Sequence, residues 1–468
     1  IIETALVVWT LVSGRSYATN IWHLTESLTI AMKLDGVAAV FSALTAVAWL
    51  LALIYSVEYM SHSQNEARFY VFLFLSEGML LGTALSADFV SMYVFYELTS
   101  LCSMPLVLHE LTHDAVTGAM KYLYYSIGGA FFVLFGIVVL YTNTSTLDFA
   151  PGGTLIAGQH TGLELLAVFF VVLGFGTKAG LFPMHTWLPD AHSQAPSPVS
   201  ALLSGVLLKC AMLVIMRFYG FTIQAVGAEY PQLLLLIVGT LSILVAALSM
   251  FRQDDLKRRF AYSSVENVGV IALCLGIGGP LGIAAALLHC VFHGFTKTLA
   301  FCVSGNIQHA FGTRSLAKIQ GVVEVAPATA ALAVLALLGL GAFPPFGMFI
   351  SEFLTFVAGV TAGPRWLVVV VALGLTVAIS ALTRIALKSV FGHAPQGMGK
   401  HEAPALMLIP EIILAVMILW FGIATPLPLV HGVETATGIV LEQSTEELHA
   451  TPMYRAVFGT ETAQSEVE

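Results

Sequence analysis

Long apolar runs dominate this chain and constrain its fold more than any other feature. A helix needs about 20 mainly apolar residues to cross a bilayer, and such runs follow one another along most of the sequence. Only 10% of the 468 residues are charged, against roughly 25% in a soluble domain, and the mean hydropathy is +0.88. The sequence therefore predicts an all-α polytopic membrane protein.

The apolar runs predict about 12–14 transmembrane helices, each roughly long enough to cross a bilayer. They lie near residues 35–57, 70–86, 88–108, 121–141, 163–189, 196–219, 231–250, 260–278, 281–303, 326–361, 365–391 and 406–424. Residues 1–13 have the length of part of a helix and begin without Met, so we expect a processed N-terminus or missing spans. The expected division is a helix remnant and external loop (1–34), a transmembrane ion-translocating domain (35–425) and an acidic external tail (426–468).

Basic residues are divided unevenly between alternate loops when each broken helix is counted as one span. One set carries most of them, including Arg252, Lys257, Arg258 and Arg259. The other side holds only Arg15, Lys33, Arg217, Arg365 and Arg455. Because cytoplasmic loops are enriched in Lys and Arg, the first set is predicted to be cytoplasmic and the C-terminus external. With 19 Lys and Arg against 28 Asp and Glu, a nucleic-acid partner is not expected.

Two of the spans contain helix breaks. The first reads Gly180-Leu-Phe-Pro183 and the second Gly341-Ala-Phe-Pro344-Pro345. Proline removes a backbone donor and clashes with the preceding turn, so each break should interrupt its helix. Matching interrupted helices in two halves of a membrane protein point to inverted repeats and an ion path near the midplane.

Five charged residues fall inside apolar runs: Glu97, Lys178, Lys209, Lys297 and Glu352. A charge at the bilayer centre costs about 3 kcal/mol or more, so these groups must face one another, water or a polar axis. Glu97 and Lys178 are expected to form an opposite-charge pair. Structural ion pairing is one interpretation of the set; ion or proton conduction is favoured, since an apolar residue would pack without the desolvation cost.

His289 and His293 precede Lys297 at helical spacing, so all three should lie on one helix face. Two histidines four residues apart can also bind zinc, but the adjacent glutamate of the HExxH motif is absent. Satisfied core histidines are a second alternative. A hydrated proton relay is favoured because histidine titrates near neutral pH.

Further residues could extend such a path: His185, His192, Tyr262, Glu266, Arg384 and Lys388. His192 could equally be a loop residue that forms hydrogen bonds. Tyr262 and Glu266 could form a point of proton uptake or reach toward the interface. Arg384 and Lys388 could end the path or anchor their helix.

Cofactor motifs are missing from this sequence. The five cysteines lie in apolar runs without a CxxC spacing and are interpreted as small buried residues. Without a GxxxxGK[ST] motif, paired GxGxxG motifs or a cysteine cluster, nucleotide hydrolysis, flavin chemistry and Fe–S electron transfer are unsupported. No cofactor or metal is therefore expected in this chain.

Four segments carry a resemblance to a known family. They are FGTKAGLFPMHTWLPDAHSQAPSPVSALLSGVLLK (175–209), DLKRRFAYSSVENVG (255–269), HCVFHGFTKTLAFCVSG (289–305) and FPPFGMFISEF (343–353). The chain resembles, over roughly residues 35–425, the antiporter-like subunits of complex I, Mrp-type cation/proton antiporters and membrane-bound hydrogenases. That family implies two inverted five-helix repeats, each with a broken helix, inside a multi-subunit complex in a bacterial or archaeal cell (inner) membrane.

The resemblance also implies roles for individual residues. Glu97, Lys178 and Lys209 match the glutamate, the broken-helix lysine and the connecting lysine of the first repeat. The His289, His293 and Lys297 group matches the central axis, and Glu352 matches the terminal charged residue of the second broken helix. Glu352, YSSVENVG and FPPFGMFISEF are most similar to hydrogenase-4 component F.

The function expected from this resemblance is proton translocation in a redox-driven, hydrogenase- or complex I-like complex. Fe–S, nickel–iron or flavin centres are then expected only in partner subunits, with other membrane and soluble subunits and the lipid bilayer as partners. An Mrp-type Na⁺/H⁺ antiporter component is one alternative. A proton-coupled membrane component of an inorganic-carbon uptake system is another.

Overall fold

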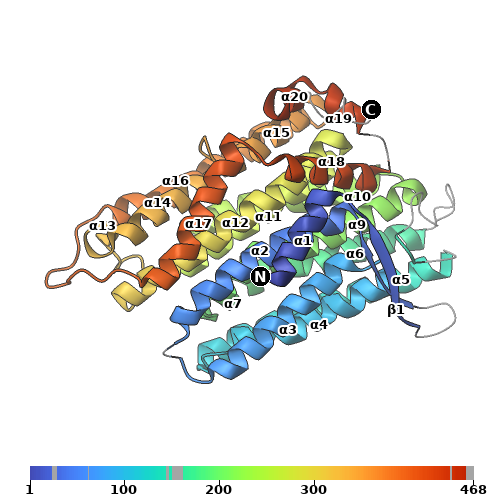
Figure 1. The fold of residues 1–468 in the computed structure, drawn as a ribbon. Coiled ribbons are helices and arrows are strands. Elements are labelled where there is room, and N and C mark those ends of the chain that lie inside the picture. Colours follow the sequence, from blue (N-terminus) through green and yellow to red (C-terminus); the bar gives the residue numbers. More distant parts are fainter. Residues whose placement is uncertain (24–28, 62, 144–146, 150–161, 443–444, 460–468) are drawn as a thin grey trace.

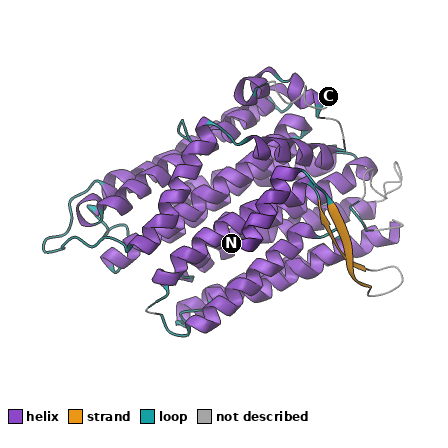
Figure 2. Ribbon diagram, in the orientation of Figure 1, coloured by secondary structure: helices purple, strands orange, loops and turns teal. Residues whose placement is uncertain are grey.

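Helices lying side by side along a common direction make up nearly all of the molecule (Figure 1, Figure 2). The computed structural model describes residues 1–468 except 24–28, 62, 144–146, 150–161, 443–444 and 460–468. Eleven of the described helices are long and apolar enough to cross a membrane. The chain is therefore a multi-pass membrane protein, as its apolar runs predicted.

The elements follow one another in three stretches. The first comprises α1 (Ile2–Ser13), β1 (Tyr17–His23), β2 (Thr29–Leu34), α2 (Gly36–Tyr59), α3 (Glu66–Leu85), α4 (Phe89–Val107) and α5 (His113–Asn143). The second comprises α6 (Gly162–Ala179), η1 (Met184–Thr186), α7 (Trp187–Gln194), α8 (Ser197–Leu202), η2 (Leu203–Leu207), α9 (Leu208–Val226), α10 (Glu229–Met250), α11 (Leu256–Ile277) and α12 (Gly279–Phe311). The third comprises α13 (Val322–Val325), α14 (Pro327–Leu340), α15 (Gly347–Thr361), α16 (Arg365–Ile385), η3 (Ala386–Val390), α17 (Ala405–Ile423), α18 (Leu427–Leu441), α19 (Glu446–Ala450) and α20 (Pro452–Phe458).

A β-hairpin corrects the prediction of an all-α chain. Strands β1 and β2 pair antiparallel, and every residue of β1 is exposed. The sequence reasoning assigns this part of the chain to an external loop. Its mixture of Thr, Ile, Tyr and Trp is typical of strands, but the segment is too polar to register among the apolar runs. The chain is therefore mostly helical rather than wholly so.

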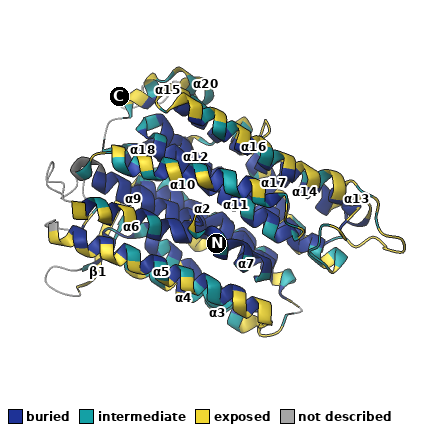
Figure 3. Cartoon of the chain, turned by 180° about the vertical axis from the view of Figure 1, so that it is seen from behind, coloured by how far each residue is buried: buried dark blue, intermediate teal, exposed yellow. Residues whose placement is uncertain are grey.

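Burial separates a central group of helices from an outer one (Figure 3). In the most apolar stretch of α12, and in that of the helix from α8 to α9, every residue is buried. In α10, α16 and α17 the corresponding share is 39%. Gly205 and Gly294 allow η2 and α12 to touch, because a Cβ on Gly205 would lie 3.0 Å from the Gly294 carbonyl. The central helices are those that carry most of the predicted site residues.

Both predicted breaks interrupt their helices. Helix α6 ends at Ala179, directly before Gly180, and η1 begins after Pro183. Helix α14 ends at Leu340, and α15 begins after Pro344 and Pro345. The peptide bonds Phe182–Pro183 and Pro344–Pro345 are both cis. The chain thus contains two short helix pairs where the sequence has two long apolar runs.

Two π-helical segments occur in the described helices, η2 before α9 and η3 after α16. In η2 the amide of Leu208 donates to the carbonyl of Leu203, five residues earlier. Such segments are often found at functional sites. The stretch 427–458 is also folded, since α18 packs against α2 and α12; its placement outside the membrane remains a prediction.

Candidate functional site: a row of buried ionisable side chains

A row of buried ionisable groups crosses the central helices. We call it the buried polar row, and its members are Glu97 (α4), Lys178 (α6), Lys209 (α9), Glu266 (α11), His289, His293 and Lys297 (α12), and Glu352 (α15). All are buried except Glu97, which is half-buried. Electrostatic interactions connect neighbours: Glu97 with Lys178, Lys209 with His289 and His293, and Glu266 with both Lys297 and Glu352. The structure therefore brings together the residues that the sequence selected.

The predicted ion pair between Glu97 and Lys178 is not formed. The ammonium of Lys178 instead donates to the carbonyl of Tyr96, and it lies 3.5 Å from the centre of the Tyr96 ring. Tyr96 directly precedes Glu97, so the carboxylate is close, but its Oε1 is buried without a hydrogen-bond partner. The backbone and the ring face thus solvate a cation that was expected to meet a carboxylate.

Lys209 lies beside the π-helical segment η2. Its side chain is fully buried, and its ammonium donates to the carbonyl of Ser204 within that segment. The hydroxyls of Ser204 and Ser264 lie 2.7 Å apart, which joins η2 to α11. The acceptor of the Lys209 ammonium is therefore a neutral backbone group.

Lys297 follows the same pattern. Its ammonium donates to the Phe260 carbonyl at 2.7 Å and to the Ser263 hydroxyl at 2.9 Å, both on α11. No carboxylate oxygen lies within 4.0 Å of Lys178, Lys209 or Lys297 in the described part of the chain. A carbonyl or hydroxyl can accept a hydrogen bond from either a protonated or a neutral amine. These lysines can therefore change charge without losing their partners.

His289 connects three helices through hydrogen bonds. Its Nε2 lies 3.1 Å from Asn267 Oδ1, and its Nδ1 lies 2.9 Å from the Ser351 hydroxyl. Asn267 Nδ2 donates to Glu266 Oε2 at 2.5 Å, which leaves its Oδ1 as the acceptor for an Nε2–H.

Two arrangements of the Ser351 proton suit the two charge states of His289. With neutral His289, the Ser351 hydroxyl donates to Nδ1. With a charged ring, Nδ1 donates to the hydroxyl, whose proton turns to the Met348 carbonyl 3.0 Å away. The site can thus gain or lose a proton by rotating one hydroxyl group.

His293 has no such partners. Its ring stacks on that of His289, with centres 5.8 Å apart, and neither of its nitrogens has a hydrogen-bond partner. Buried polar groups are normally satisfied by protein or by ordered water. The alternative of a satisfied core histidine therefore fits His289 but does not fit His293, which has room for a relay partner.

The candidate residues next to the row divide in the structure. Glu266 is buried, so it does not reach toward the interface. His185 lies beside Tyr262, with ring centres 6.3 Å apart, and its Nδ1 has no partner. His192 lies in a helix, stacked on Phe301, and neither of its nitrogens is bonded, so a loop residue that forms hydrogen bonds is not what is found.

Arg384 and Lys388 lie apart from these groups. Both side chains are exposed near the end of α16 and in η3. The Arg384 guanidinium lies 5.7 Å from the centre of the Phe251 ring. This placement on the outer surface suits helix anchoring, whereas a role at the end of a path would need a neighbouring subunit to cover them.

Sequence reasoning missed several residues around the row. Lys257 counts as a loop charge in the sequence, but it is buried and donates to the Ala195 carbonyl at 3.0 Å. Together with Lys209 and Lys297 it interacts electrostatically with His192. Asn267 and Ser351, the partners of His289, were not selected either. Their position beside Glu266 and Glu352 in the quoted motifs was the available signal.

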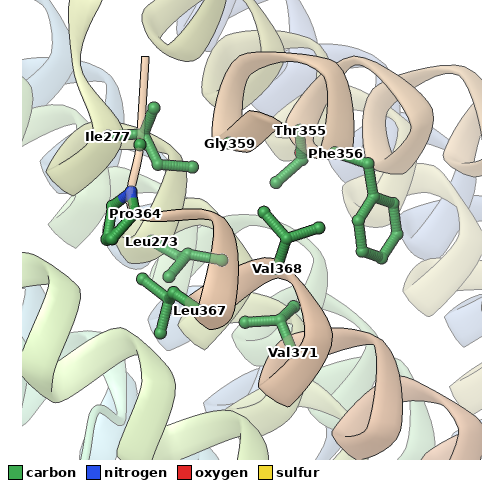
Figure 4. A pocket seen from close by; sticks show the side chains of 10 residues that line it. Leu273, Ile277, Thr355, Phe356, Gly359, Pro364, Leu367, Val368 and Val371 are labelled. Atoms are coloured by element: carbon green, nitrogen blue, oxygen red, sulfur yellow. The ribbon is translucent and has the colours of Figure 1, made fainter. Parts of the chain in front are cut away.

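The other pockets lie away from this row. A small space between α11, α15 and α16 is lined by apolar side chains such as Leu273 and Val368 (Figure 4). Its volume is about 10 Å³, room for no more than about one water molecule. The hydroxyl of Thr355 in its wall already donates to the Ser351 carbonyl. No cluster of three or more His, Cys, Asp or Glu that could hold a metal occurs among the described residues.

Comparison with known proteins identifies relatives along almost the whole chain. Residues 86–378 match the family described as "NADH:quinone oxidoreductase/Mrp antiporter, TM", and residues 22–70 match "NADH-Ubiquinone oxidoreductase (complex I), chain 5 N-terminus". A hydrogenase-4 component F homolog of Methylacidiphilum infernorum is 32% identical over 382 residues, covering 78% of this chain and 79% of its own. The N subunit of NADH-quinone oxidoreductase from Desulforudis audaxviator is 30% identical over 436 residues, covering 88% and 86%.

A further relative is a longer protein. The A1 subunit of the Na(+)/H(+) antiporter from Staphylococcus haemolyticus is 30% identical over 448 residues, which cover 89% of this chain and 55% of that protein.

Solved structures share the fold at lower identity. A chain of the membrane-bound sulfane sulfur reductase, an archaeal respiratory membrane complex, superposes with a TM-score of 0.87 at 23% identity, covering 98% of this chain and 92% of its own. A chain of the Mrp complex from Dietzia sp. DQ12-45-1b gives 0.83 at 20% identity, with the same coverage. The motifs, the matched residues and the relatives agree: the chain belongs to the NADH:quinone oxidoreductase/Mrp antiporter transmembrane family.

Proposed function

We propose that this chain translocates protons as one subunit of a redox-driven membrane complex of the hydrogenase or complex I kind. The observation that carries this proposal is that the three lysines of the buried polar row donate to backbone carbonyls rather than to carboxylates. An ion pair would fix the charge of each lysine. Carbonyl acceptors leave each amine able to lose and regain its proton, as a conducting group requires.

The proposed path follows the buried polar row. Protons enter near Glu97 and Lys178, pass by way of Lys209 to the His289, His293 and Lys297 group, and leave toward Glu352. His185, His192, Tyr262 and Glu266 line the approach from the cytoplasm. A change of charge at one position alters the proton affinity of the next, so the row can pass a signal electrostatically.

The two breaks support a proposal of two related halves with inverted five-helix repeats. Gly180 and Pro183 in the first half correspond to Gly341 and Pro344 in the second. Lys178 lies just before one break, and Glu352 lies just after the other. The charged ends of the row would then be equivalent positions in the two halves.

Redox chemistry in partner subunits would supply the driving force. The relative named hydrogenase-4 component F homolog and the likeness in fold to a chain of a respiratory complex support this assignment. Fe–S, nickel–iron or flavin centres would lie in those partners. In this proposal the Lys- and Arg-rich loops face the cytoplasm of a bacterial or archaeal cell and the C-terminus lies outside.

Na⁺/H⁺ exchange is the second candidate, because other relatives of this chain are named as components of Na(+)/H(+) antiporters. In that case the row would carry protons in one direction while another subunit or pathway carries the cation. Exchange by the reconstituted complex without any electron donor would favour this candidate. Proton transport that requires an electron donor would favour the first.

Replacement of Lys178 tests the path directly. In the native complex reconstituted into proteoliposomes, Lys178→Ala should reduce the number of protons moved per electron pair while electron transfer continues. Lys318→Ala is the matched control, since Lys318 is exposed in a loop. An unchanged proton stoichiometry in the Lys178→Ala complex would contradict the proposed path.

The subunits that co-purify with the native complex separate the candidate assemblies. Mass spectrometry that finds a nickel–iron hydrogenase-like or quinone-reductase module with Fe–S proteins would support redox-driven pumping. Small hydrophobic antiporter subunits alone would favour exchange. An inorganic-carbon uptake enzyme would point to the remaining alternative.

A further inference from the structure

A second buried acid lies outside the row, on α17. Glu411 is fully buried; its Oε2 accepts a hydrogen bond from Asn306 Nδ2 at 2.8 Å, while its Oε1 has no partner. Asn306 Oδ1 lies 3.1 Å from the Tyr55 hydroxyl, which is also 2.9 Å from the Cys302 carbonyl. We call Glu411, Asn306 and Tyr55 the α17 acid cluster.

No cation balances Glu411. In the described part of the chain, no Lys, Arg or His nitrogen lies within 4.0 Å of its carboxylate. The titratable groups that interact with it from neighbouring segments are Tyr55 on α2, Cys302 on α12 and Glu402 just before α17. Each of these is neutral or negative, so a charged Glu411 would be a buried anion without compensation.

A polar cavity approaches this cluster from one end of the bundle. Its volume is about 450 Å³, and it lies where α2 and α12 end and α17 begins, toward the left of Figure 1. The lining includes Glu58, Tyr59, Glu110, Gln308, His309 and Met407. A space of this size with carboxylate, imidazole and amide walls holds water.

Only a short distance separates the cavity wall from the cluster. Gly305 lines the cavity and precedes Asn306. A Cβ on Gly305 would lie only 2.4 Å from the Tyr55 hydroxyl, so this hydroxyl lies directly behind the wall. Met407, also in the lining, is one helical turn before Glu411 on α17.

We propose that Glu411 is a second proton-binding site, separate from the buried polar row, that exchanges its proton with water in the cavity bounded by Gly305 and Met407. On loading, a hydronium ion in the cavity gives its proton to Oε1 through intervening water, so that an O–H bond forms on the carboxyl group and water remains. Release is the reverse transfer. Asn306 holds Oε2 in both states, so only the unpartnered oxygen takes part.

Infrared spectroscopy of the protein in lipid vesicles tests this proposal. Replacement of Glu411 by Gln, which is nearly isosteric, should remove one protonated-carboxyl band, and in the unmodified protein that band should shift soon after transfer to D₂O. Glu434→Gln is the matched control, because Glu434 is buried on α18 but bonded to the Tyr454 hydroxyl at 3.2 Å. An unchanged carboxyl region in Glu411→Gln, or a band that resists D₂O for hours, would overturn the proposal.

Carbodiimide labelling provides a second test that needs no variant. Dicyclohexylcarbodiimide adds to protonated carboxyl groups in apolar surroundings, and mass spectrometry locates the adduct. Glu411 should be labelled, with a yield that falls as the pH is raised. Absence of label on Glu411 when Glu352 is labelled would contradict the proposal. Both tests concern proton occupancy alone, so they can succeed even if the row carries no protons.

Discussion

Two buried cations on the same helix, Lys209 and Arg217, are held in opposite ways. Arg217 forms two hydrogen bonds to Asp35, of 2.8 and 2.7 Å, so its charge is fully paired with a carboxylate. Lys209, about two turns earlier on α9, donates only to a backbone carbonyl. The paired cation joins α9 to the start of α2, whereas the other can change its charge. Burial alone thus does not identify a conducting residue; the type of partner does.

Removing one half of the paired charge should have the largest effect. Asp35→Ala leaves the Arg217 guanidinium buried without a counter-ion, which should lower the free energy of unfolding by about 3–5 kcal/mol. Thermal unfolding in detergent, followed by size-exclusion chromatography, measures the loss. Asp114→Ala, at an exposed position, is the control. The double variant Asp35→Leu with Arg217→Met should regain most of the stability, and failure to do so would count against pairing as the cause.

Replacing the unpaired charge should affect transport rather than stability. Lys209→Met removes a buried amine that has no carboxylate partner, so unfolding should stay near that of the unmodified protein while proton transport falls about tenfold or more, equivalent to ~1.4 kcal/mol on the barrier. Lys209→Arg sharpens the comparison, because arginine keeps its charge at all relevant pH values. Transport that survives in Lys209→Arg would show that a fixed charge is sufficient there.

Acid should weaken the paired site in a defined direction. Burial raises the pKa of Asp35, but the charge and hydrogen bonds of Arg217, with the Ala38 amide, lower it overall below its ordinary value of 3.8. A depressed carboxyl pKa stabilises the fold fully above that ordinary value, and the contribution is lost as the pH falls through the folded value. The melting temperature of the unmodified protein should therefore fall more between pH 7 and strongly acidic pH than that of the Asp35→Leu, Arg217→Met variant. Parallel curves would refute this assignment.

The smallest effect is expected at Ser351. Ser351→Ala removes the hydroxyl that serves both charge states of His289, at a cost of about 1 kcal/mol in stability. Transport should slow by more than in Ser380→Ala, the control on α16, whose exposed hydroxyl donates to the Thr376 carbonyl. Equal transport in the two variants would mean that His289 does not depend on this hydroxyl to exchange its proton.

Much of the fold and the choice of site residues could be predicted, because both follow from local sequence. Apolar runs locate helices, prolines locate breaks, and charges such as Lys209 and Lys297 are conspicuous inside apolar runs. The partners could not be predicted in the same way. The Lys178 ammonium meets the Tyr96 carbonyl rather than the Glu97 carboxylate because the outcome depends on how α4 and α6 pack.

Depth was the second failure of sequence reasoning. Lys257 stands in a basic cluster typical of a loop, yet it turns inward from the first turn of α11 to the Ala195 carbonyl. Glu411 was overlooked although it lies inside an apolar run. The hairpin of β1 and β2 was missed because its signal is alternation over a few residues, whereas a search for long apolar runs ignores such short segments.

The π-helical segment η2 sets the angle at which Lys209 points. It holds one residue more than an α-helical turn needs, so everything after it is rotated about the helix axis by about 100° relative to an uninterrupted helix. Deleting a single residue between 203 and 207 would keep the composition and every charge of α9. It would nevertheless swing both Lys209 and Arg217 to another side of the helix. The segment thus acts as an angular offset in the backbone, and the position of both cations depends on chain length as much as on residue identity.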